Sequence, residues 1–258
     1  MVDQTDEEWT AIVVDDAGPE PGAGELVAAL GDARIRYVRN DSNLGISANF
    51  NRCLELGAQS AEVVSIFHAD DMLEPGYVAA IRAGHRAFPR AACVAPRAVV
   101  IDRVGRPTRT LADSVKHLLW PRRLPFVLAG DRGLGRLMHG LFFYCPAVSY
   151  RVDLLPALRF DGRWRQVMDL DLFARVLLGR GSIALVADCV YRYRRHQATT
   201  SAQNSRSSVR VREEVAVIRE IVAEARARQW RRTARAGRLR LTVRLNDWWS
   251  RNRWVRVG

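Results

Sequence analysis

Two short apolar runs, each ending in a pair of carboxylates, constrain the fold of this chain more than any other feature. The run IVVDD ends at Asp16, and the run VVSIFHADD ends at Asp71, 55 residues further along the chain. Apolar, β-branched runs of this length are typical of buried parallel strands, whose carboxyl ends border ligand crevices. We therefore expect the two acid pairs, Asp15 with Asp16 and Asp70 with Asp71, to converge on one crevice.

Helical and extended patterns alternate around these two runs. The pattern predicts helices over residues 25–31, 43–57 and 75–88 and strands over residues 33–40 and 91–102. Glycines would close the first two helices, and Pro75 would stand in the first turn of the third. This alternation indicates an α/β fold, with an open, mostly parallel sheet covered by helices on both faces.

The chain is less regular from Asp102 to Gly140. The glycine-rich stretch GDRGLGRLM, residues 130–138, predicts a loop that leads into a helix. It is not a dinucleotide-binding fingerprint, because no buried strand precedes it and no acid follows about 20 residues later. Beyond it we expect a strand, a helix that begins near Met168, and a last strand or pair of strands.

Positive charge is concentrated at the C-terminal end. The net charge is +12, but residues 206–258 hold 15 arginines against five acidic residues, which leaves residues 1–205 nearly neutral. We expect an α/β domain over residues 1–205 and a basic tail over residues 206–258. Apolar residues at helical spacing from Val211 to Ala225 predict an amphipathic helix in the tail.

Two interpretations of this tail remain open. Its arginines and tryptophans suit the surface of an anionic membrane, whereas the alternative is a helix packed on the domain and followed by a solvated end. No recognised nucleic-acid-binding module accompanies the charge, so we expect no nucleic acid partner.

The sequence favours a cytoplasmic protein. The four cysteines are far apart and form no metal-ligand or CxxC spacing, which is typical of reduced thiols. No run of 18 apolar residues occurs, and the acidic N-terminus lacks the apolar core of a secretory signal. Peripheral attachment at the inner face of the plasma membrane is the alternative that the tail leaves open.

Four segments, taken in order, resemble the family 2 glycosyltransferases of the GT-A fold. They are IVVDDAGPEP, RNDSNLGISANFNRCLELGAQSAEVVSIFHADDMLEPGY, WRQVMDLDLFARVLLGRG and YRRH. The resemblance covers roughly residues 9–200, and the ordered set is far more specific than any single motif. It implies a metal-dependent, inverting hexosyltransferase that moves a sugar from a nucleotide diphosphate sugar, of UDP type, to a glycan or lipid-linked acceptor hydroxyl. Such transfer belongs to cell-wall or polysaccharide biosynthesis.

The resemblance also implies a metal site. HADD stands where the family carries its DxD motif, so Asp70 would face Mn²⁺ or Mg²⁺, and Asp71 would support the turn or the donor sugar. His68 replaces the first acid of the motif, and its imidazole can still donate a hydrogen bond to the donor ribose. In the closing YRRH motif, Arg194 would meet the pyrophosphate and His196 the metal. The ordinary alternatives are a strand-end acid that caps the next helix and basic groups on the surface.

Nucleotide and acceptor chemistry are implied for other positions. Asp16 would accept a hydrogen bond from a nucleobase N–H, whereas Asp15 would be a solvated turn acid. Gly45 and Asn51 would lie beside the nucleotide, near a helix N-terminus that favours phosphate. Asp169, in a motif whose first acid is replaced by a methionine, would be the general base. The alternatives are a capped helix without a ligand and an ordinary acid at a helix start.

One departure from the family concerns its first strand and helix. Both would precede the equivalent of Gln4 and Thr5, and both are absent from this sequence. The missing strand is expected to be central, so its absence would leave unpaired backbone groups and a hole in the core. Either the start of the chain is misassigned or truncated, or the fold is damaged. The alternative function is therefore a non-catalytic relative that binds a nucleotide or a partner. A nucleotidyltransferase is a weaker option, because the glycine-rich N-terminal loop of that class is absent.

Overall fold

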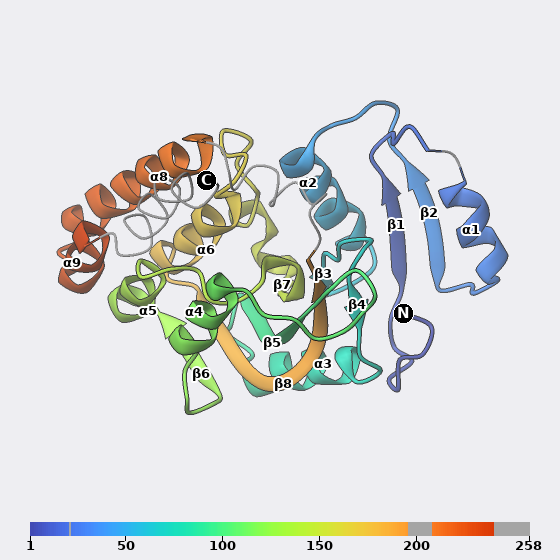
Figure 1. The fold of residues 1–258 in the computed structure, drawn as a ribbon, viewed down its shortest axis with the longest axis horizontal. Coiled ribbons are helices and arrows are strands. Elements are labelled where there is room, and N and C mark those ends of the chain that lie inside the picture. The colour runs from blue at the N-terminus through green and yellow to red at the C-terminus, as the bar shows by residue number, and fades with distance from the viewer. Residues whose placement is uncertain (21, 196–207, 240–258) are drawn as a thin grey trace, which may run out of the picture.

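The computed structural model describes residues 1–20, 22–195 and 208–239. In this part of the chain, the strands form two separate β-sheets, and the helices pack around them (Figure 1). His196, which the sequence analysis offered as a metal ligand, lies outside the described residues.

The N-terminal unit is a parallel β-α-β arrangement. Strand β1 (Ala11–Asp15) pairs with β2 (Ile35–Arg39), and helix α1 (Ala23–Leu30) connects them. Gly31 adopts the left-handed conformation (φ 63°) that ends α1, as its position in the sequence predicted. Helix α2 (Ile46–Gly57) follows β2 and corresponds to the helix predicted over residues 43–57.

The second sheet has six strands in the order β3-β7-β5-β8-β4, with β6 also paired to β8. Its strands are β3 (Val63–Ser65), β4 (Met72–Leu73), β5 (Cys93–Ile101), β6 (Phe126–Ala129), β7 (Ser149–Arg151) and β8 (Ser182–Arg194). The β5–β8 ladder is parallel and the other ladders of this sheet are antiparallel. The expected mostly parallel sheet is therefore divided into a parallel two-stranded sheet and a six-stranded sheet of mixed direction. A strand that is buried on both faces shows the same apolar run in either direction. The sequence pattern therefore could not predict whether neighbouring strands are parallel or antiparallel.

Helices cover both faces of the six-stranded sheet, which confirms that part of the α/β prediction. Helix α3 (Tyr77–Ala87) packs on one face with Val94 and Val186, whereas α6 (Met168–Leu178) packs on the other with Cys93 and Leu185. Alternate residues of β5 and β8 therefore belong to different core clusters, as the two-residue period of a strand requires.

Gln4 fixes the start of α3, because its Oε1 accepts from the Val78 N–H at 2.9 Å and its Nε2 donates to the Glu74 carbonyl at 2.8 Å. The helix begins at Tyr77, so Pro75 precedes the first turn in which we had placed it. Helix α4 (Leu111–Leu119) and two 3₁₀ turns (Cys145–Ala147 and Val152–Ala157) lie between the later strands.

The glycine-rich stretch that predicted a loop forms helix α5 (Gly130–Leu137) instead. A Cβ on Gly133 would lie 2.8 Å from the Leu128 backbone, and one on Gly135 would lie 3.2 Å from the Arg232 backbone. These glycines let α5 approach its neighbours closely, and the resulting burial outweighs their low helix propensity.

The first part of the basic tail is integral to the core. It forms α8 (Ser208–Ala227) and α9 (Arg231–Leu239), which lie beside α5 and α6 (Figure 1). The apolar side of α8 joins the same buried cluster as α6, through Val217, Ile218, Ile221 and Val222. The packed-helix interpretation therefore holds for this part of the tail. The tryptophans at 248, 249 and 254 lie outside the described residues, and their membrane role stays a prediction. None of the helices in the described part of the chain is both long and apolar enough to cross a membrane.

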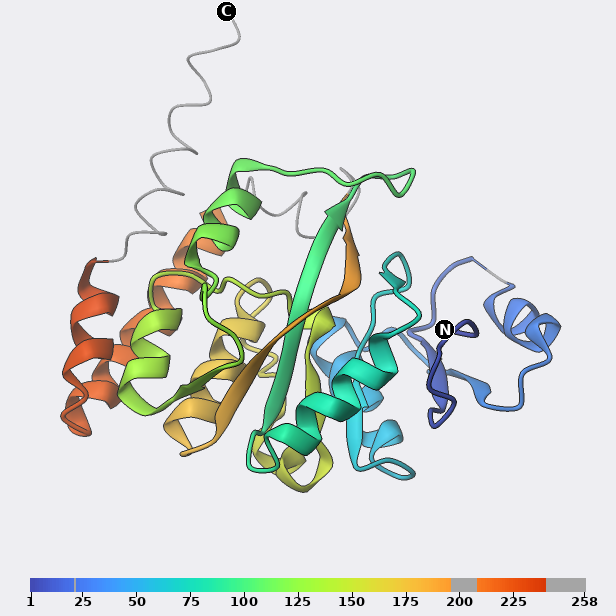
Figure 2. The same ribbon diagram turned by 90° about the horizontal axis from the view of Figure 1, so that it is seen from below.

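The β1–β2 sheet stands apart from this core (Figure 2). Among the described residues from Ala11 to Asn40 none is buried, and Leu26 in α1 is 72% exposed. Strand β1 pairs only with β2, and β3 only with β7, among the described strands.

Replacing Ile221, which is 4% exposed in α8, by alanine should lower the free energy of unfolding by about 2–5 kcal/mol, because a cavity would form between α8 and the domain. Leu118→Ala in α4, where the side chain is 76% exposed, is the control and should change it little. Urea denaturation of the full chain measures both. Equal stability of the two variants would show that α8 packs too loosely to belong to the core.

Candidate functional site

The acidic turn after β3 brings together His68, Asp70 and Asp71. One ligand atom from each lies within 4.8 Å of the others. The Asp71 side chain is only 1% exposed and accepts hydrogen bonds from the Tyr191 hydroxyl and the Arg194 N–H, both at 2.6 Å. Burial raises the pKa of Asp71, although these two hydrogen bonds act in the opposite direction. The acidic turn is thereby bonded to the end of β8.

Arg194 holds the same turn from its other side. Its Nε donates to the Asp70 carbonyl at 2.6 Å, and its Nη1 donates to the carbonyls of Asp102 and Arg103 at 2.9 Å. The guanidinium therefore joins the acidic turn to the end of β5. The contacts of Asp71 and Arg194 are those of groups that shape the turn, and contact with a nucleotide sugar stays a proposal for both.

The three side chains of the acidic turn fit a divalent cation. Imidazole nitrogen with carboxylate oxygen is a donor set that Mn²⁺ accepts, whereas Mg²⁺ prefers oxygen alone. Both Asp71 oxygens already accept hydrogen bonds, so His68 and Asp70 are the better placed ligands. Sequence reasoning had given His68 only a hydrogen-bonding role, and its place beside the carboxylates adds metal coordination to what it can do.

Asp16 organises the loop between β2 and α2. Its Oδ1 accepts from Asn40 Nδ2 and the Leu44 N–H, both at 2.9 Å, and its Oδ2 accepts from the Gly45 N–H at 3.1 Å. Gly45 has a positive φ of 79°, which glycine adopts without strain. The structure thus brings together Asp16 and Gly45, two residues that the sequence analysis placed beside the nucleotide.

Asp15 is not the solvated turn acid that we expected. It accepts from the Tyr37 hydroxyl at 2.5 Å and the Gly18 N–H at 2.9 Å, and it also pairs with Arg39. The hydrogen bond from Tyr37 is the main reason why the pKa of Asp15 lies below its usual value. Tyr37 and Arg39 come from β2, which the sequence pattern could not align with β1 residue by residue.

Asn51 faces the protein. Its Nδ2 donates to the Phe160 carbonyl at 2.9 Å, and its Oδ1 accepts from the Phe160 N–H at 2.8 Å. This pair of hydrogen bonds holds α2 against the segment that leads into α6. A nucleotide contact for Asn51 stays a proposal.

Asp169 lies in the first turn of α6, near the positive charge of Lys116. Its Oδ1 accepts from the Leu170 N–H at 2.8 Å. Burial lowers the pKa of Lys116 to about 8, and the charge of Asp169 opposes that decrease. Lys116 Nζ lies 4.1 Å from the centre of the Tyr144 ring.

A row of aromatic rings connects this region to the acidic turn. Tyr144 stacks on Tyr193 with ring centres 4.8 Å apart, and the Tyr193 ring lies 6.5 Å from that of His68. Tyr144 and Tyr193 thus connect Lys116, whose charge Asp169 stabilises, to the acidic turn.

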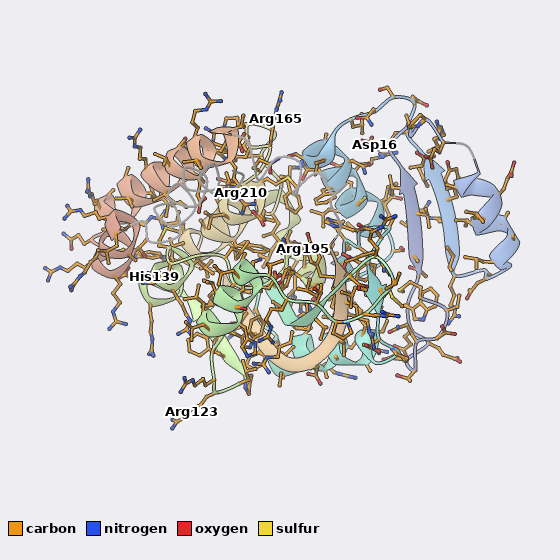
Figure 3. All side chains as sticks on the ribbon, in the orientation of Figure 1. Asp16, Arg123, His139, Arg165, Arg195 and Arg210 are labelled. Atoms are coloured by element: carbon orange, nitrogen blue, oxygen red, sulfur yellow. The ribbon has the colours of Figure 1, made fainter. Side chains whose placement is uncertain are left out.

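Sequence reasoning missed Asp113, the residue that organises this region. Asp113 and Thr110 form a capping box at the start of α4, and Asp113 Oδ1 also accepts from the Tyr144 hydroxyl at 2.8 Å and from Arg195 Nη2 at 2.7 Å. Figure 3 shows Arg195 near the middle of the molecule. The T-x-x-D spacing was visible in the sequence, as was Lys116, the one lysine of the chain.

The sequence model of Glycosyl transferase family 2 matches residues 1–153. The S. aureus TarS structure in complex with UDP-GlcNAc is similar, with a TM-score of 0.64 at 16% identity, over 86% of this chain and 59% of that one. The TarS structure in complex with UDP gives a TM-score of 0.60 at 16% identity, over 86% of this chain and 58% of that one. None of the curated proteins compared with this sequence matches it.

The chain thus spans about three fifths of the length of the TarS structures that it matches. At 16% identity this likeness shows a shared fold, and it confirms the expected GT-A-like architecture. The family match covers more than half of the chain and contains the acidic turn. The protein therefore belongs to glycosyl transferase family 2.

Proposed function

We propose that this protein transfers a sugar from a UDP sugar to an acceptor hydroxyl, with inversion at the sugar carbon and with Mn²⁺ or Mg²⁺. The observation that carries the proposal is the acidic turn, in which His68, Asp70 and Asp71 lie within ligand distance of one another. Family membership gives the turn its reaction class, and the TarS structures with UDP-GlcNAc and UDP favour a uridine nucleotide. The acceptor would be a glycan or a lipid-linked glycan, as in cell-wall or polysaccharide biosynthesis.

His68 and Asp70 would hold the cation, and Asp71 would fix the turn through Tyr191 and Arg194. A cation at this place neutralises charge on the diphosphate that leaves the sugar. Because Asp71 is buried and bonded, the turn is already shaped before the nucleotide arrives, which lowers the cost of ordering it on binding.

Asp169 would accept the proton of the acceptor hydroxyl as the new glycosidic bond forms. An inverting transfer needs this base on the face of the sugar opposite the diphosphate. Lys116, on whose charge Asp169 acts, lies against the Tyr144 ring. Tyr144 stacks on Tyr193, and Tyr193 lies next to His68 of the acidic turn. That Asp169 shares a site with the acidic turn is part of this proposal.

A binding module without turnover is the second candidate. It is favoured by the β1–β2 unit, in which none of the described residues is buried and which pairs with no strand of the larger sheet. Such a module would bind UDP and yet release no UDP from a UDP sugar. The next experiment separates the two candidates.

Asp70→Asn should weaken Mn²⁺-dependent binding of UDP at least tenfold, because it removes a charged ligand from the ground-state complex. Asp169→Asn should leave that binding nearly unchanged and lower the rate of UDP release from UDP-GlcNAc by about 10²- to 10⁴-fold, since a general base acts in the transition state. Calorimetry measures the binding, and a UDP-release assay with a glycan-containing membrane extract measures the rate.

Asp188→Asn, at an exposed position in β8, is the matched control and should alter neither quantity. Equal loss of UDP affinity in Asp70→Asn and Asp169→Asn would make Asp169 a structural residue. UDP binding by the unchanged protein without any UDP release would favour the binding module.

Asp16→Asn tests how the nucleobase is selected. The Asp16 carboxylate accepts three hydrogen bonds and has capacity for about one more, which would be the N–H of uracil. We expect the affinity for UDP to fall more than the affinity for CDP, whose base lacks that N–H. Calorimetric titration with the two nucleotides gives the comparison. A parallel fall in both affinities would show that Asp16 only holds the loop that contains Gly45.

A further inference from the structure

A cavity of about 390 Å³ lies between the end of β5 and helix α4. The loop that joins these two elements runs along one end of the larger sheet (Figure 2). The residues of its lining that matter most for binding are Arg97, Arg109, Asp113, Lys116, Trp120 and Tyr144. None of these residues was assigned a role by the sequence analysis.

The lining of this cavity carries more positive than negative charge. Arg97 and Arg109 form no ion pair with any residue in the described ranges, and Arg97 lies over the Trp120 ring at 5.7 Å. The one acidic group of the lining, Asp113, is already paired with Arg195 at 2.7 Å. Two arginines and Lys116 thus line the cavity without an acidic group in its described lining that balances their charge, which suits an anion.

Trp120 belongs to the wall of the cavity. It is 7% exposed, and Arg97 lies over its ring, which holds the guanidinium at the cavity wall.

The cavity adjoins the site proposed for catalysis. Lys116 and Tyr144 belong to its lining, and both take part in the contacts that connect Asp169 with the acidic turn. Tyr144 stacks on Tyr193, which lies next to His68. A molecule bound in the cavity would therefore extend toward Asp169, the proposed base for the acceptor hydroxyl.

We propose that this cavity binds a phosphate group of the acceptor, so that the acceptor is a phosphate-bearing glycan. The inference rests on the proposed function, since it names the class of acceptor. Arg97 and Arg109 bind phosphate oxygens through their planar guanidinium groups, and Lys116 adds a point charge. The phosphate takes no part in the reaction and positions the neighbouring hydroxyl at Asp169.

Binding of sn-glycerol 3-phosphate to the full chain, measured by calorimetry beside glycerol, tests the cavity directly. The phosphate ester should bind and glycerol should not. Arg97→Gln and Arg109→Gln should each weaken binding about tenfold, because each removes charge-assisted hydrogen bonds. Arg123→Gln makes the same change of charge at an exposed position that points away from the body (Figure 3) and should leave binding unchanged. Equal weakening in all three variants, or no binding of the ester, overturns the proposal.

A titration in the presence of UDP and Mn²⁺ separates the acceptor cavity from the donor site. The affinity for sn-glycerol 3-phosphate should stay the same when UDP is bound. Competition between the two ligands would mean that the cavity takes the donor diphosphate, and it would overturn the proposal. If UDP fails to bind with Mn²⁺ while the ester still binds in the cavity, the proposed glycosyl transfer fails and an anion site remains.

The same binding should weaken several-fold between pH 7 and pH 9.5. Burial lowers the pKa of Lys116 to about 8, so Lys116 loses its charge over this range, whereas arginine stays protonated and the ester stays dianionic. The charged groups that act on Lys116 are Asp113 on α4, Asp169 on α6, Arg195 directly after β8 and Arg210 on α8, and carboxylates and guanidiniums keep their charge throughout. Lys116→Gln should bind the ester less tightly at pH 7 and with no such pH dependence. A decline of the same size in that variant would rule out Lys116 as a phosphate ligand.

Discussion

The buried carboxylate of Asp71 is the interaction on which the candidate site depends. It accepts from a side chain and from the backbone of β8, at Tyr191 and Arg194, and so fixes the turn that carries Asp70 and His68. Burying a carboxylate without hydrogen-bond partners costs free energy, so Asp71 can be buried here only because these two donors bind it. The position of a short acidic turn is thus determined by the last strand of a sheet more than 100 residues further along the chain.

The parallel β5–β8 ladder makes this arrangement possible. Its alternate residues contribute to cores on both faces, and its carboxyl end supplies Arg194 and Arg195 to the two halves of the site. Arg194 bonds to the acidic turn, whereas Arg195 bonds to Asp113 beside the cavity. Helices α8 and α9 enlarge the core on the α6 face, so part of the most basic region of the sequence stabilises the fold.

The sequence predicted what local patterns determine and missed what long-range packing determines. The order of elements, the ends of α1 and α2 and the acidic turn follow from apolar periods, glycines and an ordered set of family motifs. Strand direction, the bonded state of Asp15 and the helix at α5 depend on neighbours distant in sequence, which no local pattern specifies. Asp113 and Lys116 were missed for the same reason, because their importance comes from the cavity around them.

Charge explains why one site would need two separate groups of countercharges. The donor diphosphate and an acceptor phosphate are both anions, and two unit charges 10 Å apart repel by about 1.7 kcal/mol at an effective dielectric constant of about 20. A cation at the acidic turn neutralises only the donor side. Arg97, Arg109 and Lys116 would neutralise the acceptor side, with uncharged tyrosine rings between the two groups. Separate countercharges let both anions approach Asp169 together, which a transfer between two phosphate-bearing substrates requires.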